Sequence, residues 1–365
     1  MRSTRVLFDT QAFRLQRIGG ISRYFAELIR RLPSFNVVPI LHMPLVNNEH
    51  AVTAGLSSKT GSRILAAHSS VQRLVHAALR HSDSILSALG RFDILHRTYY
   101  SETRAVRRPV VCTVVDMIPE LLPHYFPGGN PHERKREVVQ ASDLVFSISE
   151  STSRDIVQLY GCRPERVVTT PLGIDLPLFA NAPKLTNPFK APYVLFVGSR
   201  GGYKNFRRFS AAAAGVLAGH ADLTLAVVGG GALQQEELEV FSRAGVRDRV
   251  RQATVPDATL PTVYREAEVF AFPSEYEGFG LPLLESFACN CPVAASRTSC
   301  FPEVGGQAIE YFDPTSTDEI AQAIARVLES SMRANELRRL GSERVKLFTW
   351  ERTAERTAAA YARLL

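Results

Sequence analysis

Two carboxylates in one short stretch are the side chains of this 365-residue chain best placed to do chemistry. They are Glu277 and Glu285, within EYEGFGLPLLESFACNC (275–291). The apolar run VFAF before the stretch predicts a buried strand, and the glycines after Glu277 predict a turn. Pro282 suits the first position of a helix, because its missing N–H would be unpaired there. A strand, a glycine turn and a helix N-terminus together form an anion site. We therefore expect the flanking acids to contact hydroxyl groups or developing positive charge.

A second loop carries the complementary charge. SRGGYKN follows the apolar run YVLFVG, which ends at Gly198, and it places Arg200 and Lys204 on either side of two glycines. Both cations form charge-assisted bonds to phosphate oxygens, so the loop predicts a diphosphate clamp. Ligands of open parallel sheets bind beyond the carboxyl ends of the strands. The loop QATVPD, with Thr254 and Val255, is therefore expected to border a base. No G-x-G-x-x-G motif is present, which argues against NAD.

Short apolar runs alternate with helical patterns along the whole chain, which predicts an α/β protein with doubly wound parallel sheets. We expect a first domain over 1–175, a proline-rich linker over 176–190, a second domain over 191–350 and a last helix over 351–365. The expected strands lie within 5–9, 36–43, 92–100, 109–120, 143–149 and 166–175 in the first domain, and within 191–200, 222–231, 250–255, 268–274 and 292–297 in the second.

The length fits two cores, and no apolar run reaches the roughly 20 residues of a membrane span. The N-terminus lacks the apolar run of a secretory signal, and the five cysteines include no C-x-x-C pair. The sequence therefore predicts a cytoplasmic protein without a metal site or a bound cofactor.

Positive charge is concentrated in the first half of the chain. Residues 1–180 carry 22 Lys and Arg against 15 Asp and Glu, and residues 59–108 carry nine against three. An excess of this kind predicts an anionic partner. Within it, 63–90 mixes aliphatic residues and arginines without aromatics to stack on bases, which favours the inner surface of the cytoplasmic membrane over nucleic acid. The alternative is a solvated helix that covers the core.

The first half also offers candidate ligand contacts. Gly19 and Gly20 precede a helical pattern, where they would let a ligand approach the backbone. Asp116 directly follows the buried run VVCTVV, so its charge needs a role in a ligand site. His96 and Tyr99 lie at the end of another expected strand and are candidates for acceptor or sugar contacts, although a histidine there also often satisfies local backbone.

EGFGLPLLE is similar to the E-x7-E signature of retaining glycosyltransferases of family four, which have the GT-B fold. Other segments resemble this family in the same order along the chain: GGISRY, VVDMIPE, SISESTSRDIV, PLGID, VGSRGGYKN, SCFPEVGGQAIEYFDP and TWERTAERTAAAY. The resemblance implies two Rossmann-like domains that face each other across a cleft, the first binding the acceptor and the second the nucleotide sugar, with the last helix packed back on the first domain.

The resemblance also implies a role for each matching residue. Glu285 would hold the ribose hydroxyls of a nucleotide-diphospho sugar, and Glu277 would contact the transferred sugar. Arg200 and Lys204 would neutralise charge on the leaving diphosphate, and no D-x-D motif is present to hold a metal. The backbone facing the donor would come from Gly278, Phe279, Gly280 and Leu281, with Gly19 and Gly20 near the phosphates.

One position departs from the family. Many members carry histidine before the aspartate of the segment that matches VVDMIPE, but this chain has Val115 before Asp116. Valine cannot donate a hydrogen bond to a sugar, so that contact is either absent or supplied by another side chain, for which His96 is a candidate.

The implied activity is transfer of a hexose with retention of configuration, in which the leaving phosphate oxygen takes the acceptor proton. The family pattern favours mannose or rhamnose from a GDP-sugar and a glycan or lipid-linked oligosaccharide acceptor of a bacterial surface polysaccharide. The alternative is a non-catalytic protein on the same fold that binds sugar nucleotides or polyanions.

Overall fold

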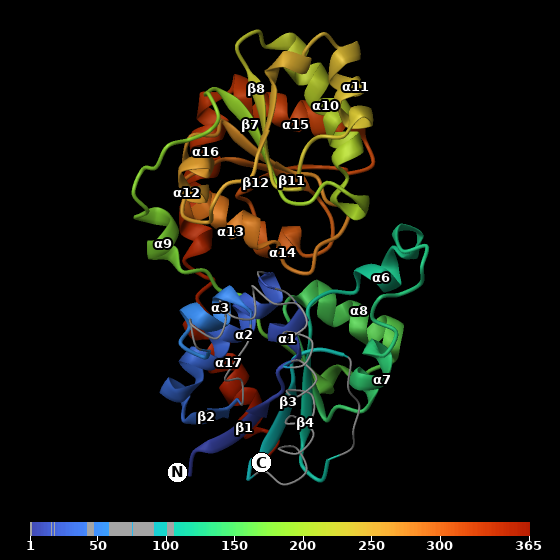
Figure 1. The fold of residues 1–365 in the computed structure, drawn as a ribbon, viewed down its shortest axis with the longest axis vertical. Coiled ribbons are helices and arrows are strands. Elements are labelled where there is room, and N and C mark those ends of the chain that lie inside the picture. The colour runs from blue at the N-terminus through green and yellow to red at the C-terminus, as the bar shows by residue number, and fades with distance from the viewer. Residues whose placement is uncertain are drawn as a thin grey trace. The chain divides into compact units, whose positions relative to one another are not determined.

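The structure is a computed structural model that describes residues 2–15, 17, 19–41, 47–57, 75, 91–100 and 106–365. The chain divides into two compact units (Figure 1). Unit 1 is Met1–Gly173 with Trp350–Leu365, and unit 2 is Ile174–Thr349. The basic stretch 63–90, expected to contact a membrane surface, lies outside the described residues except for Val75.

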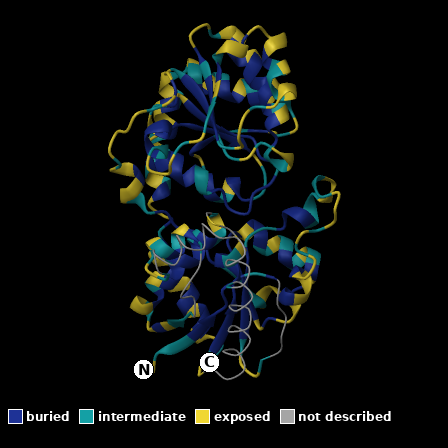
Figure 2. Cartoon of the chain, viewed as in Figure 1, coloured by how far each residue is buried: buried dark blue, intermediate teal, exposed yellow. Residues whose placement is uncertain are grey.

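Unit 1 is built on a parallel sheet of six strands in the order β2-β1-β3-β4-β5-β6. Every residue of β3, β4 and β5 is buried, and Figure 2 colours the buried parts of the chain dark blue. Such burial is usual when helices cover both faces of a parallel sheet. The strands are β1 (Thr4–Phe8), β2 (Val37–Ile40), β3 (Ile94–Arg97), β4 (Val110–Val114), β5 (Leu144–Ser147) and β6 (Val167–Thr169).

Helices cover this sheet with their apolar faces. In α2 the residues Tyr24, Phe25, Leu28 and Ile29 are buried, which matches the apolar face that the sequence predicts. The described helices of unit 1 are α1 (Gln11–Leu15), α2 (Gly20–Arg31), α3 (Glu49–Thr53), α6 (Ile118–Leu121), α7 (Lys135–Gln140), α8 (Glu150–Tyr160) and α17 (Trp350–Ala362).

The last helix, α17, belongs to unit 1 although it follows unit 2 in the sequence. The Thr353 hydroxyl donates to the Pro171 carbonyl at 2.6 Å, and the Tyr361 hydroxyl lies 2.5 Å from Nδ1 of His96 in β3. Trp350 is 1% exposed. These contacts anchor α17 at both ends.

Unit 2 contains a second parallel sheet of six strands, in the order β12-β11-β10-β7-β8-β9. Its strands are β7 (Tyr193–Val197), β8 (Thr224–Val228), β9 (Val250–Ala253), β10 (Val269–Phe272), β11 (Val293–Ser296) and β12 (Ile309–Phe312). Its helices are α9 (Leu176–Ala180), α10 (Phe206–Gly219), α11 (Gln235–Arg243), α12 (Leu260–Arg265), α13 (Leu281–Ala288), α14 (Phe301–Gly305), α15 (Thr317–Glu329) and α16 (Ser331–Val345). Side chains of α10, α11, α15 and α16 share one buried cluster with the sheet.

The predicted α/β class with parallel sheets is confirmed, and three details differ. The sheet of unit 2 gains β12, which the strand pattern did not predict. The helix after Glu277 begins at Leu281, so Pro282 is its second residue. The expected linker 176–190 begins with α9. Among the described residues, no helix has the length and apolarity needed to cross a membrane.

Replacing Tyr361 by Phe removes the hydroxyl beside Nδ1 of His96 and leaves that buried nitrogen without its partner. We expect the free energy of unfolding of unit 1 to fall by about 1–3 kcal/mol, the cost of an unsatisfied buried polar group. Trp350 is the one tryptophan of the chain, so its fluorescence during urea unfolding reports on unit 1.

Tyr311→Phe is the matched control, because it removes a hydroxyl of unit 2 that donates to the Gly306 carbonyl at 2.8 Å. The midpoint of the Trp350 transition should not change in this variant. Equal shifts in the two variants would contradict a local role for Tyr361.

Candidate active site

The strand order of unit 2 brings the two predicted loops together. The chain runs outward through β7, β8 and β9, and then returns to β10 on the other side of β7. The loops after β7 and β10 therefore lie where the strand order reverses, which is the place where open α/β sheets bind ligands. Lys204 follows β7, and Glu277 follows β10.

Asn205 fastens these two loops to each other. Its side-chain amide donates to the carbonyls of Pro273 at 3.1 Å and Pro314 at 2.8 Å. Its backbone is left-handed, with φ 58°, a conformation that asparagine adopts more readily than most residues. The backbone N–H of Glu275 also donates to the Tyr203 carbonyl at 2.8 Å. The positions of Lys204 and Glu277 are thus fixed by backbone contacts on both loops.

Glu277 is held through one of its two carboxylate oxygens. Oε1 accepts from Nζ of Lys204 at 2.6 Å and from the Ser274 hydroxyl at 2.7 Å. The backbone N–H of Glu277 donates to the Ser299 hydroxyl at 3.1 Å, which fixes the main chain as well. Within the described part of the chain, no group forms a hydrogen bond or ion pair with Oε2. This oxygen is therefore available to accept a hydrogen bond from a hydroxyl group of a ligand.

The backbone beside Glu277 provides donors. Gly280 has a left-handed φ of 86°, and a Cβ atom there would lie 3.1 Å from a ring carbon of Phe301. Only glycine fits this turn without strain. Among the described residues, the N–H groups of Phe279, Gly280 and Leu281 donate to no other group of the protein. At the start of α13 these groups carry the positive end of the helix dipole, which favours an anion.

Glu285 lies within α13 and is 8% exposed. The hydroxyl of Tyr264, from α12, donates to its Oε2 at 3.3 Å. Burial raises the pKa of Tyr264 well above its usual value, and the carboxylate of Glu285 raises this pKa further. The Tyr264 hydroxyl therefore stays protonated and holds Glu285 in one orientation. The sequence predicted a site role for Glu285 but none for Tyr264, whose position is typical of the apolar face of a helix.

Arg200 makes contacts that the sequence did not predict. Its guanidinium donates to Glu237 at 2.8 Å and to the carbonyls of Gly229, Gly231 and Ala232 at 2.9, 2.9 and 2.7 Å. These bonds occupy four of its five N–H groups, and its side chain is 5% exposed. Arg200 thus braces the glycine loop after β8, and a contact with diphosphate stays a prediction.

The structure gives the positions of the remaining residues that are expected to contact the sugar nucleotide, and their roles stay predictions. Gly198 lies at the end of β7, where its N–H donates to the Val228 carbonyl at 2.9 Å. Thr254 is exposed, and Val255 is partly buried just after β9. In unit 1, Gly19 precedes α2, and a Cβ atom on Gly20 would meet open space.

His96 is a core residue, which corrects the expectation that it contacts a sugar or replaces the imidazole missing at Val115. It is fully buried, with its ring stacked between Phe8 and Phe146. Its Nε2 lies 2.8 Å from the Thr113 hydroxyl, and its Nδ1 lies beside Tyr361. Burial lowers the pKa of His96 to about 3, so the ring is neutral at physiological pH. The residue type at a strand end could not show that the ring faces the core.

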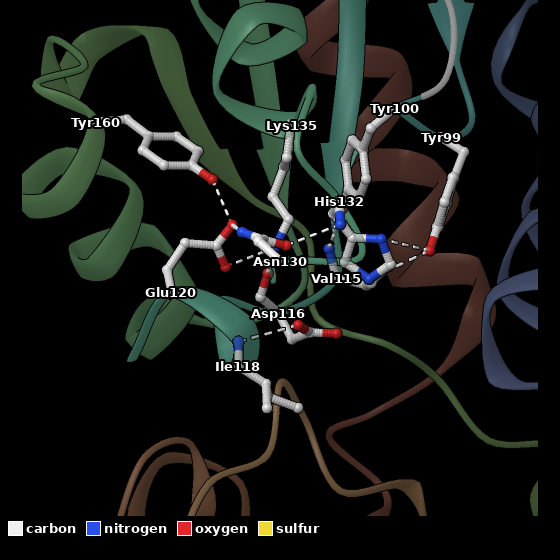
Figure 3. A network of polar contacts seen from close by, with 10 residues as sticks. All are labelled: Tyr99, Tyr100, Val115, Asp116, Ile118, Glu120, Asn130, His132, Lys135 and Tyr160. Carbon is white, nitrogen blue, oxygen red and sulfur yellow. Dashed lines mark hydrogen bonds and ion pairs between the residues drawn. The ribbon is translucent and has the colours of Figure 1, made fainter. Parts of the chain in front are cut away.

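Asp116 and Tyr99 lie in one polar network of unit 1 (Figure 3). Oδ1 of Asp116 accepts from the N–H of Ile118 at 3.1 Å and so begins α6. Burial raises the pKa of Tyr99 to about 12, and the negative charge of Asp116 adds to the shift. The Tyr99 hydroxyl lies 3.1 Å from Nδ1 of His132, a residue that the sequence analysis did not single out. Within the described ranges, no group of three or more His, Cys, Asp or Glu residues could hold a metal ion.

Two family models match the chain. One is described as glycosyltransferase family 4 and matches residues 18–177, and the other is described as glycosyl transferases group 1 and matches residues 180–344. The chain is 26% identical over 391 residues to the O-antigen chain mannosyltransferase B of Escherichia coli, with 98% of this chain and 99% of that protein covered. It is 30% identical over 309 residues to a D-inositol 3-phosphate glycosyltransferase of Thermobispora bispora, with 76% and 72% covered.

The fold is also found among solved structures. The crystal structure of Anabaena HepE in complex with UDP and glucose matches with a TM-score of 0.68 and 18% identity, over 99% of this chain and 100% of that chain. The structural neighbours include enzymes with the GT-B fold, which is the fold of this chain.

Gly280→Ala tests the turn that begins α13. The added Cβ would combine a left-handed backbone with a contact of 3.1 Å to Phe301. Gly231→Ala is the matched control, because Gly231 has a similar φ of 73° but nothing within 4 Å of the added atom. We expect the control to lose about 1–2 kcal/mol from the backbone conformation alone, and Gly280→Ala to lose more. Calorimetric unfolding of both variants measures this, and equal losses would contradict the close packing.

Proposed function

The chain belongs to the glycosyltransferases of family 4 and group 1, and we propose that it transfers a hexose from a nucleotide-diphospho sugar to a glycan acceptor. The observation that carries this proposal is the geometry of Glu277. One carboxylate oxygen accepts hydrogen bonds from Lys204 and Ser274, and the other accepts none from the described residues, in the loop that leads into the free amide donors of α13. Such a site offers an acceptor for sugar hydroxyls beside donors for a diphosphate.

Each residue takes a role from this arrangement. Oε2 of Glu277 accepts a hydrogen bond from a hydroxyl of the transferred sugar, while the N–H groups at the start of α13 donate to diphosphate oxygens. The ammonium of Lys204, which already bonds Glu277, is proposed to neutralise charge on the leaving diphosphate as well. Positive charge that is already in place where negative charge develops stabilises the transition state. We propose that these groups perform this task without a metal ion.

Glu285 is proposed to bind the ribose. Two adjacent hydroxyls suit a carboxylate, and Tyr264 orients that carboxylate. The bond between the anomeric carbon and the phosphate oxygen breaks as the bond to the acceptor oxygen forms on the same face, so the configuration is retained. The leaving phosphate oxygen takes the acceptor proton. No side-chain nucleophile is required in this scheme.

The donor and the acceptor are narrower proposals. Relatives named as mannosyltransferases, including one for an O-antigen chain, support mannose or rhamnose from a GDP-sugar and an acceptor of a bacterial surface polysaccharide. A lipid-linked acceptor would bring the enzyme to an anionic membrane surface, which suits the basic excess within 59–108. The alternative is a non-catalytic protein that binds the sugar nucleotide alone.

Lys204→Ala, Glu277→Gln and Glu285→Gln test the assignment. Each should lower kcat/KM for transfer by about 100-fold or more, the usual loss when one preorganised contact to the transition state is removed. Lys346→Ala and Glu343→Gln are matched controls, because both side chains are exposed at the end of α16. Transfer to a labelled oligosaccharide measures the effect. Wild-type turnover in the three site variants would refute the mechanism.

The donor base is tested by calorimetry with GDP, UDP, ADP and dTDP. A ligand that binds only the native state raises its melting temperature, and we expect the largest rise with GDP. The rise should be lost in Glu285→Gln, which removes a charge from the ribose contact. A larger rise with another nucleotide would overturn the choice of GDP. Binding without any transfer would favour the non-catalytic alternative.

A further inference from the structure

Arg200 and Lys204 belong to one loop, but they bond to opposite sides of β7. Lys204 bonds Glu277, which follows β10, whereas the hydrogen-bond partners of Arg200 come from the loop after β8 and from α11. Strands β10 and β8 flank β7 on its two sides. The two cations therefore hold different loops, and Arg200 needs a role of its own.

Arg200 holds residues 229–232, the glycine loop, by their carbonyl groups. Nη1 donates to the carbonyls of Gly229 and Gly231, both at 2.9 Å, and Nη2 donates to that of Ala232 at 2.7 Å. The three glycines of the loop have left-handed backbones with φ between 70° and 88°, a conformation that glycine adopts without a steric cost. These turns direct three carbonyl groups of one short segment at a single cation.

With these carbonyls turned toward Arg200, the glycine loop presents N–H groups on its opposite side. In a trans peptide the N–H of the next residue points away from the carbonyl. The groups turned outward are therefore those of Gly230, Ala232 and Leu233. Within the part of the chain that the structure describes, none of these three N–H groups donates to another group. They are available to a ligand, and the bonds of Arg200 set their direction.

Glu237 fixes the guanidinium of Arg200 from the other side. Oε1 of Glu237 accepts from Nε of Arg200 at 2.8 Å, and Oε2 accepts from the backbone N–H of Gln234 at 2.7 Å, just before α11. The guanidinium also lies over the ring of Phe206, 5.6 Å from its centroid. A planar guanidinium can stack on a ring and bond in several directions at once, which an ammonium cannot. This position therefore uses the shape of arginine as well as its charge.

The glycine loop is also joined to the loop after β9, which is expected to border the donor base. The N–H of Gly229 donates to the Ala253 carbonyl at 3.2 Å, and Nε2 of Gln252 donates to the Gly229 carbonyl at 3.3 Å. Strand β8 lies between β7 and β9. A donor with its diphosphate beside Lys204 and its base at the loop after β9 therefore crosses the glycine loop with its nucleoside.

Gly230 leaves the space that Arg200 occupies. A Cβ atom on Gly230 would lie 2.5 Å from Nη1 and 3.2 Å from Cζ of Arg200, well inside van der Waals contact. Nη1 holds two of the three carbonyls. An added methyl group would therefore displace the guanidinium from the loop and leave every charge of the site in place.

We propose that Arg200 and Glu237 are positioning residues for the nucleoside part of the donor. Glu237 fixes Arg200, and Arg200 fixes the glycine loop, whose outward N–H groups donate to the nucleoside. The proposal rests on the proposed glycosyltransferase function and deepens it, because it assigns the two residues a task in recognising the donor through the loop. The alternative for Arg200 is the direct contact with diphosphate that the family resemblance implies.

Guanosine and GDP separate these two roles, because guanosine has no phosphate. Saturation-transfer NMR measures binding of the nucleoside, and calorimetric titration measures binding of GDP. Arg200→Lys keeps the charge but loses the planar fork, and Gly230→Ala keeps the charge but displaces the fork. We expect each variant to bind both ligands about tenfold more weakly, the effect of losing roughly one hydrogen bond to the ligand. KM for transfer should rise with little change in kcat.

Gly231→Ala separates this effect from backbone strain. Gly231 has a φ of 73°, similar to that of Gly230, but nothing lies within 4 Å of the added Cβ. The difference between the two variants therefore measures the displacement of Arg200. Lys204→Ala gives the pattern of a diphosphate contact, with weaker binding of GDP and unchanged binding of guanosine.

Glu237→Ala tests the second residue of the proposal. It removes the carboxylate that fixes Arg200, and it should weaken binding of guanosine and GDP by equal factors. Glu239→Ala is the matched control and should bind both ligands as the wild type does, because Glu239 is exposed on the same helix and pairs with Arg243. Melting curves followed by circular dichroism check that each variant is folded at the temperature of the titrations.

Two results would overturn the proposal. In one, Arg200→Lys and Gly230→Ala bind guanosine as tightly as the wild type; in the other, Glu237→Ala binds both ligands as tightly as the wild type. Uridine with UDP, adenosine with ADP and thymidine with dTDP are the further pairs. If a pair binds the wild type and the variants lack the equal losses, the positioning role fails alone. If no pair binds the wild type, the proposed function fails.

Discussion

The ion pair between Lys204 and Glu277 is the contact around which unit 2 is arranged. The two side chains follow neighbouring strands, lie 2.6 Å apart, and are mostly buried. Burial makes an unpaired charge costly, so each side chain needs the other, and the loops that carry them must stay in register. Asn205 holds the loops together because its side-chain amide donates to the backbone carbonyls of Pro273 and Pro314. The pairing also uses only one oxygen of Glu277, which leaves the carboxylate both fixed and able to bind a substrate.

The two units present different kinds of polar group to a ligand. Unit 2 places an ammonium and free amide donors at the start of a helix, which suits a charged diphosphate. Unit 1 places the His132 imidazole and the Tyr99 hydroxyl in a pocket beside two ion pairs, Lys135 with Glu120 and Arg134 with Glu137. The ion pair of Lys135 with Glu120 holds a loop through its contact with Asn130, whereas that of Lys204 with Glu277 lies in the proposed donor site.

The sequence predicted the features that depend on local pattern and failed where a contact depends on distant packing. The strand, glycine turn and helix around Glu277 follow from residue types within 20 positions, and the structure contains them. Arg200 was expected to bind phosphate because its loop is basic, and that contact stays a prediction; the sequence did not show that three carbonyls and Glu237 from farther along the chain occupy four of its five N–H groups. His96 was misassigned because strand alternation does not show which ring faces the core. Tyr264 and His132 gave no signal, since their roles arise only when α12 packs on α13 and when a loop is fixed by Glu120.

Val115 follows β4 at the position where many family members carry a histidine, so this chain has no imidazole there. An imidazole at the end of β4 would be fixed by the sheet, whereas the imidazole of His132 is fixed by a loop through Asn130 and Glu120. A loop residue can move or change without disturbing the strands that carry the core. The pocket in unit 1 and the Glu277 site in unit 2 share no residue.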